Sequence, residues 1–168
     1  MKVGSSIIYT FIKLFISIVT IMMPIFNYSN LKIIFIVIFS LYGIINLVQY
    51  MIDKDKQNIF YSLNSFLLVI LSILLNINGR QRYLALSLGV WFIISSLIKL
   101  KRVDNYRDSK ASYWKFYSLS LGIFVLAGLL ALINLGYPHE IEVLVVGFLL
   151  FIENSLELLN SLVKTITK

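Results

Sequence analysis

The sequence contains no cysteine and a single histidine, and only 14% of its 168 residues are charged. The absence of cysteine excludes disulfides, thiolate nucleophiles and cysteine-based metal sites. The lone His139 cannot build a histidine-rich metal centre either. A soluble domain of this length would carry charges on about a quarter of its residues to cover its surface. The shortage of charge therefore argues against a soluble protein.

Apolar residues make up 59% of the chain, and the mean hydropathy is +0.88. One membrane crossing needs about 20 apolar residues. Continuous apolar runs of about that length occupy residues 6–26, 31–52, 59–77, 83–100, 116–135 and 141–163. The runs lack the strict alternation that is typical of a membrane β-barrel. The sequence thus predicts an all-α polytopic membrane protein with six transmembrane helices, a single domain over residues 1–168, and a polar loop at 101–115.

The distribution of basic residues predicts the orientation, because loops on the cytoplasmic side carry the excess of Lys and Arg. One side of the predicted bundle would hold Lys2, Lys54, Lys56, Lys99, Lys101, Arg102, Arg107, Lys110, Lys115, Lys164 and Lys168. The other side would hold Lys32, Arg80 and Arg82. Both termini are therefore expected in the cytoplasm. The net charge of +7 is interpreted as this topology signal, and no nucleic-acid partner is expected.

The chain also resembles itself at intervals of about 55 residues. The sequence Phe-Tyr-Ser-Leu begins two of the predicted helices, at 60–63 and at 116–119. Aligning Gly89 with Gly147 makes two sets of residues equivalent: Gly43, Ser96 and Asn154, and then Asn46, Lys99 and Glu157. This pattern predicts three helical hairpins in parallel, at roughly 6–52, 59–100 and 116–163. The alternative is that apolar sequences resemble one another through composition alone.

Four stretches carry a pattern of glycines, one proline and aromatic residues: Thr20–Pro24, Gly43 within Leu41–Ile45, Trp91–Arg102, and Tyr113–Gly136 with Gly122 and Gly128 inside it. In these stretches the chain resembles a known family, the HdeD-type acid-resistance membrane proteins of bacteria. The resemblance implies a small six-helix protein of the bacterial inner membrane with a role in acid or envelope stress. It implies no catalytic residues. The chain departs from the pattern at Ser96, where glycine is expected, and at Glu153, Asn154 and Glu157.

Ionisable residues within predicted membrane helices are the first candidates for function. Lys13, Glu153 and Glu157 are the three that lie well inside the apolar runs and not at their ends. Lys13 lies at the same predicted depth as the two glutamates, so a Lys13–Glu157 or Lys13–Glu153 pair would dock the first helix onto the last. A glutamate left unpaired would titrate and give a proton-responsive site. The alternative is that Lys13 and Glu157 reach the membrane interface with their long side chains.

Polar residues within the helices are expected to form hydrogen bonds between helices. The candidates for such contacts are Asn46, Ser96 and Asn154. Phosphate-binding, metalloprotease and serine-hydrolase motifs are absent from the sequence, so neither an enzyme nor a cofactor is expected. The lipid bilayer is the expected partner, and the sequence leaves open a homo-oligomer or a membrane partner protein.

Two functions remain as hypotheses. The first is a non-enzymatic membrane protein of the HdeD type, linked to acid or envelope stress. The second is a transport component, either a proton or small-solute pathway or the substrate-binding subunit of an importer. The outer halves of the predicted helices at 31–52, 83–100 and 141–163 carry few polar residues. This distribution argues against a continuous channel and leaves open a cavity that opens inward.

Overall fold

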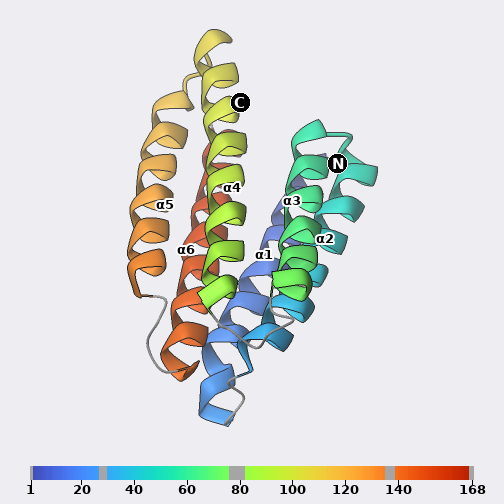
Figure 1. The fold of residues 1–168 in the computed structure, drawn as a ribbon. Helices are drawn as coiled ribbons and strands as arrows, with labels where there is room; N and C mark the ends of the chain where they lie inside the picture. The colour runs from blue at the N-terminus through green and yellow to red at the C-terminus, as the bar shows by residue number, and fades with distance from the viewer. Residues whose placement is uncertain (1, 27–29, 76–81, 135–138, 167–168) are drawn as a thin grey trace.

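A computed structural model of the protein describes residues 2–26, 30–75, 82–134 and 139–166. Within these residues the chain is helical, and no strand is present. The helices are α1 (Lys2–Met22), the 3-10 helix η1 (Met23–Phe26), α2 (Leu31–Asp53), α3 (Lys56–Leu75), α4 (Arg82–Asp108), α5 (Trp114–Asn134) and α6 (His139–Ile166). They run side by side as a bundle, with both chain ends at the same end of it (Figure 1). The predicted all-α fold is confirmed.

The bundle is a closed ring in which each helix packs on the next and α6 packs on α1. The most extensive packing joins α2 to α3 and α1 to α6. Each of these pairs lies between two of the predicted hairpins and not within one. Packing between hairpins therefore contributes at least as much to the fold as packing inside them.

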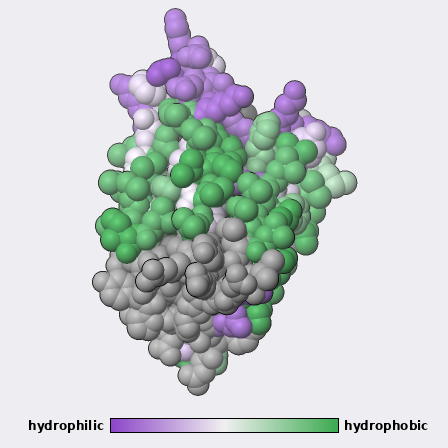
Figure 2. Space-filling model, viewed as in Figure 1, coloured by the Kyte–Doolittle hydropathy of each residue, from purple (hydrophilic) through white to green (hydrophobic). Residues whose placement is uncertain are grey.

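In the part of the chain that the structure describes, five helices are long and apolar enough to cross a membrane. Helix α4 carries Lys99, Lys101 and Arg102 in its second half and runs alongside the others (Figure 1). Figure 2 shows a hydrophilic cap at one end of the molecule, which we call the basic end, and a hydrophobic band below it. Large apolar side chains such as Phe15 and Ile133 are exposed on the flanks. These features identify a multi-pass membrane protein.

The polar segment after residue 100 is not the loop that the sequence predicts. Helix α4 continues to Asp108, so most of this segment is helical. Val103 is buried, and the Tyr106 ring lies 4.8 Å from that of Tyr117 in an edge-on arrangement. Hydropathy marks where an apolar run ends, but a helix continues as long as one of its faces still packs. The prediction of the 101–115 loop was therefore wrong for its first half.

Local signals explain where α2 begins and ends. The Asn30 side chain caps the helix by accepting a hydrogen bond from the Ile33 amide at 3.3 Å. Lys54 has a left-handed backbone with φ of 56° and donates its amide to the Tyr50 carbonyl at 2.8 Å. Asp55 then caps α3, because its Oδ1 accepts from the Gln57 amide at 2.9 Å. The turn between α2 and α3 is consequently two residues long.

The apolar core fills the half of the bundle away from the basic end. Edge-on aromatic contacts join Phe35 to Phe39 at 5.6 Å and Phe39 to Trp91 at 5.1 Å. The rings of Phe92 and Phe124 lie 5.3 Å apart. These residues, with aliphatic side chains of α6, form one continuous buried cluster. Two buried charged residues, Lys13 and Glu153, lie on the other side of this core.

Candidate functional site

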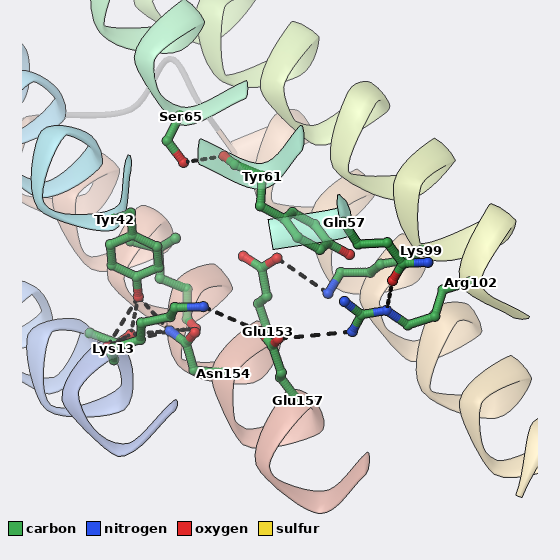
Figure 3. Close-up of polar contacts among 12 residues, drawn as sticks. Lys13, Tyr42, Gln57, Tyr61, Ser65, Lys99, Arg102, Glu153, Asn154 and Glu157 are labelled. Atoms are coloured by element: carbon green, nitrogen blue, oxygen red, sulfur yellow. Dashed lines mark hydrogen bonds and ion pairs between the residues drawn. The ribbon is translucent and has the colours of Figure 1, made fainter. Parts of the chain in front are cut away.

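Five charged side chains from three helices meet inside the basic half of the bundle (Figure 3). They form what we call the charge cluster: Lys13 of α1, Lys99 and Arg102 of α4, and Glu153 and Glu157 of α6. Lys13 and Glu153 are only 3% and 5% exposed. Burying an ionisable side chain this deeply inside a membrane protein costs free energy unless the side chain is paired.

Three ion pairs connect the cluster. Lys13 Nζ lies 3.8 Å from Glu157 Oε2, and Arg102 Nη1 lies 3.9 Å from Glu157 Oε1. Lys99 Nζ lies 3.3 Å from Glu153 Oε1. Glu157 therefore bridges α1 and α4, whereas Glu153 joins α6 to α4. Because residues one helical turn apart share a face, the two glutamates point into the bundle together.

The cluster contains more positive than negative charge. Its three cationic and two anionic side chains leave a formal excess of one positive charge when all are ionised. Aromatic rings stabilise two of the cations through cation–π contacts. Lys99 lies 4.8 Å from the Phe124 ring centroid and 5.4 Å from that of Tyr61, and Arg102 lies 5.5 Å from the same tyrosine. Tyr61 comes from the first Phe-Tyr-Ser-Leu segment, which places it beneath both α4 cations.

Asn154 holds a second group of contacts beside the cluster. Its side-chain amide donates to Ser17 Oγ at 2.8 Å and to the Tyr42 hydroxyl. The Tyr42 hydroxyl also donates to the Lys13 carbonyl at 3.1 Å. The amide thereby connects α1, α2 and α6 next to Lys13 (Figure 3).

A cavity of about 10 Å³ lies between this amide and the ion pairs. It is lined by residues of five helices, among them Asn46, Tyr61 and Glu153. Each of these three side chains carries a buried oxygen with no hydrogen-bond partner: Asn46 Oδ1, the Tyr61 hydroxyl and Glu153 Oε2. A polar cavity of this volume is large enough for one water molecule. The arrangement suits a bound water next to a buried carboxylate.

A second polar cavity, of about 20 Å³, lies on the α5 side of the cluster. Its walls include Lys99, Arg102, Glu157 and Asn160. The Asn160 amide donates to Ser120 Oγ at 2.9 Å, and its carbonyl oxygen atom Oδ1 is buried without a partner. Small polar spaces thus flank the ion pairs on both sides.

The structure brings together all three charged residues that the sequence predicts. Of the two pairs considered for Lys13, the one with Glu157 is formed. Glu153 is paired instead with Lys99, a residue that sequence analysis had assigned to topology. The predicted repeat could have indicated that Lys99 points into the bundle. It makes Lys99 equivalent to Glu157, and equivalent positions in a closed ring of helices face the same interior.

The three predicted polar candidates behave differently. Asn154 forms the expected hydrogen bonds between helices. Asn46 and Ser96 do not satisfy the expectation, since Asn46 Oδ1 and Ser96 Oγ are buried without partners. The neighbouring Ser95 makes the contact instead and accepts from the Asn64 amide at 2.8 Å. A shift of one residue rotates a helical side chain by about 100°, and the alignment of repeats lacks that resolution.

Within the described residues, no group of three or more metal-binding side chains gathers in one place. Compared with protein-family models, curated proteins and solved structures, the chain matches none of them. The charge cluster and the two polar cavities beside it are therefore the candidate functional site of the chain.

Proposed function

We propose that the chain is a non-enzymatic protein of the bacterial cytoplasmic membrane, with both termini inside, that responds to acid or envelope stress. The orientation is supported by the excess of Lys and Arg in the segments 54–56 and 99–115. Figure 2 shows a hydrophilic cap at one end of the bundle. The role follows the resemblance to HdeD-type proteins. The observation that carries the proposal is the charge cluster, in which two carboxylates hold three cations.

Acid acts on this cluster through its carboxylates. Protonating either glutamate removes a negative charge from a cluster that already contains more positive than negative charge. The remaining cations then repel one another in an environment that solvates them poorly. The groups that face the glutamates are Lys13 from α1, Tyr42 from α2, Tyr61 from α3, Lys99 and Arg102 from α4, and Tyr117 from α5. None of these groups offers a replacement negative charge at neutral or acidic pH.

The consequence is a bundle whose closure depends on pH. Glu157 links α1 to α4, and α1 closes the ring against α6. When Glu157 is protonated, its pairs with Lys13 and Arg102 are lost, so the α1–α6–α4 junction loosens and the basic half of the bundle opens. Such a change would report acidification of the cytoplasm to the membrane or to a membrane partner.

The test is the thermal unfolding of the purified protein in detergent at pH 7.5 and pH 3.0. We expect the unfolding temperature of the parent to fall in acid. The Glu153→Gln/Glu157→Gln variant should be less stable at pH 7.5 and nearly independent of pH. Asp104→Asn is the matched control, since Asp104 pairs with Arg107 at 3.1 Å on an exposed surface. Equal pH dependence in parent and double variant would remove the basis of the proposal.

A bacterial survival assay tests the physiological role. Deleting the gene in the source organism should lower survival after acid shock. The parent protein should restore survival, and the Glu153→Gln/Glu157→Gln variant should not. Unchanged survival of the deletion strain, with the protein shown to be expressed in its parent, would contradict a role in acid stress.

The water-sized cavity supports a second candidate, a pathway for protons. Glu153, with one oxygen unpartnered beside this cavity, would be the exchanging group. The apolar core beyond it, with Phe39 and Trp91, argues against continuation across the membrane. Liposomes that enclose a pH-sensitive dye distinguish the candidates. Proton flux above that of empty liposomes, abolished by Glu153→Gln or Glu157→Gln, would favour transport, and no flux would favour the stress protein.

A further inference from the structure

A groove of about 530 Å³ opens on the flank of the bundle between α3 and α4. Its floor is apolar and consists of Phe60, Ile94, Leu97 and Ile98. Phe60 and Leu97 are more than half exposed, at 51% and 59%. The groove therefore faces outward, away from the charge cluster, on a surface that a bilayer would cover.

The upper end of the groove is basic. Lys54, Lys56 and Lys101 line it, and all three are exposed. The one acidic residue there is Asp55, whose carboxylate accepts from the Gln57 amide at the start of α3. Figure 2 shows the same end of the molecule hollowed between two hydrophilic lobes. An anionic group of about phosphate size could therefore contact three lysines. The one carboxylate nearby is already occupied by its hydrogen bond to the Gln57 amide.

The wall between the groove and the interior is well anchored. Gln57 lines the groove, and its side-chain oxygen accepts a hydrogen bond from Arg102 Nε. Arg102 in turn pairs with Glu157 inside the bundle. The two-residue turn before α3 holds Lys54 in its left-handed conformation at the mouth of the groove. The cations are thus presented by a constrained turn and a helix.

From this combination we propose that the α3–α4 groove binds an anionic phospholipid. Its phosphate would lie among Lys54, Lys56 and Lys101, and one acyl chain would follow the floor past Phe60 and Leu97. Basic pockets between transmembrane helices on the cytoplasmic side bind acidic lipid headgroups in this way. The volume falls in the range of ligand pockets that combine an apolar lining with a few charged groups.

Native mass spectrometry of the detergent-purified protein tests the proposal with two lipids. Phosphatidylglycerol supplies the anionic headgroup, and phosphatidylcholine has the same chains without net charge. We expect the parent to bind phosphatidylglycerol at least tenfold more tightly, because each Lys near a lipid surface contributes about 1 kcal/mol. Equal binding of the two lipids would overturn the proposal.

Three variants locate the site. Lys54→Gln/Lys56→Gln/Lys101→Gln should lose the preference for phosphatidylglycerol. The matched control Arg107→Gln/Lys110→Gln/Lys115→Gln removes the same charge from the same end, outside the groove, and should keep it. Loss of the preference in the control to the same extent would mean that net charge alone attracts the lipid and would overturn the proposal.

The third variant, Leu97→Trp, fills the floor without changing any charge. It should weaken binding of phosphatidylglycerol while the helical circular dichroism spectrum stays that of the parent. This readout remains available if the triple lysine variant fails to fold. Unchanged lipid binding in Leu97→Trp would contradict the proposed acyl-chain path. A dimer in the mass spectrum that Leu97→Trp dissociates would assign the groove to a second copy of the chain instead.

Discussion

Lys13 of α1 and Glu157 of α6 lie 3.8 Å apart, although they come from opposite ends of the chain. The Lys13 side chain is 4% exposed and the Glu157 side chain 14%, and the same glutamate also faces Arg102 at 3.9 Å. The contact closes the helical ring at its basic half. Because the cluster has one cation in excess, its members should not contribute equally to stability.

The first prediction concerns this inequality. Glu157→Gln leaves three cations with one carboxylate, whereas Lys13→Met leaves two cations with two. Removing one partner of a buried pair costs about 3–5 kcal/mol when the other is left uncompensated. We expect a loss of about 3 kcal/mol for Glu157→Gln and a clearly smaller loss for Lys13→Met, measured by denaturant unfolding in detergent micelles. A larger loss for Lys13→Met would mean that the charge count does not govern the cluster.

The second prediction addresses the pair of Lys99 and Glu153, 3.3 Å apart. Lys99→Met leaves Glu153 with neither of its oxygens partnered, since Oε2 already lacks a hydrogen bond. Removing both members of the pair with Lys99→Met/Glu153→Gln returns the cluster to the charge excess of the parent and should recover part of the lost stability. A double-mutant cycle should give a coupling of about 1–3 kcal/mol. Additive effects of the two substitutions would show that this ion pair contributes nothing of its own.

The third prediction contrasts two buried asparagines. Asn154 donates to Ser17 and Tyr42, whereas Asn46 Oδ1 has no partner. Asn154→Leu should lower the free energy of unfolding by about 1–2 kcal/mol, because hydrogen bonds between membrane helices are of that order. Asn46→Leu should be neutral or stabilising, since it removes a buried polar atom that is unsatisfied. Thermal unfolding of the two variants side by side measures the difference, and equal losses would refute it.

The fourth prediction concerns the contact of α1 with α6. A Cβ on Gly147 would lie 2.9 Å from the backbone nitrogen of Ile21, so Gly147→Ala must push the two helices apart. Overpacking of this kind costs about 1–3 kcal/mol. Gly122→Ala is the matched control on α5, where an added Cβ meets nothing within 4 Å. Thermal unfolding should show destabilisation in Gly147→Ala alone, and an unaffected Gly147→Ala would place α1 further from α6.

Parts of the candidate site could be predicted from particular residues. The charges at positions 13, 153 and 157 are exceptional within apolar runs, and charge in a membrane has to be compensated. That reasoning predicts a pair of Lys13 with Glu157 or with Glu153, and the structure forms the pair with Glu157. It missed Lys99 and Arg102, because Lys and Arg near the end of an apolar run are also the residues that indicate the cytoplasmic side of a membrane protein. Only their side-chain directions distinguish the two roles.

What the sequence by itself determined is the class of protein and the order of its helices. Continuous apolar runs leave the backbone no alternative in a bilayer, because every peptide group must bond within its own helix. The tertiary structure decided which helices pack together, how far α4 extends, and which cation each glutamate receives. Those outcomes depend on the rotation of each helix about its axis, and one residue changes that rotation by about 100°. Hydropathy is an average over several helical turns and does not depend on the rotation of a helix. The charge cluster and the α3–α4 groove therefore form only when the helices pack together.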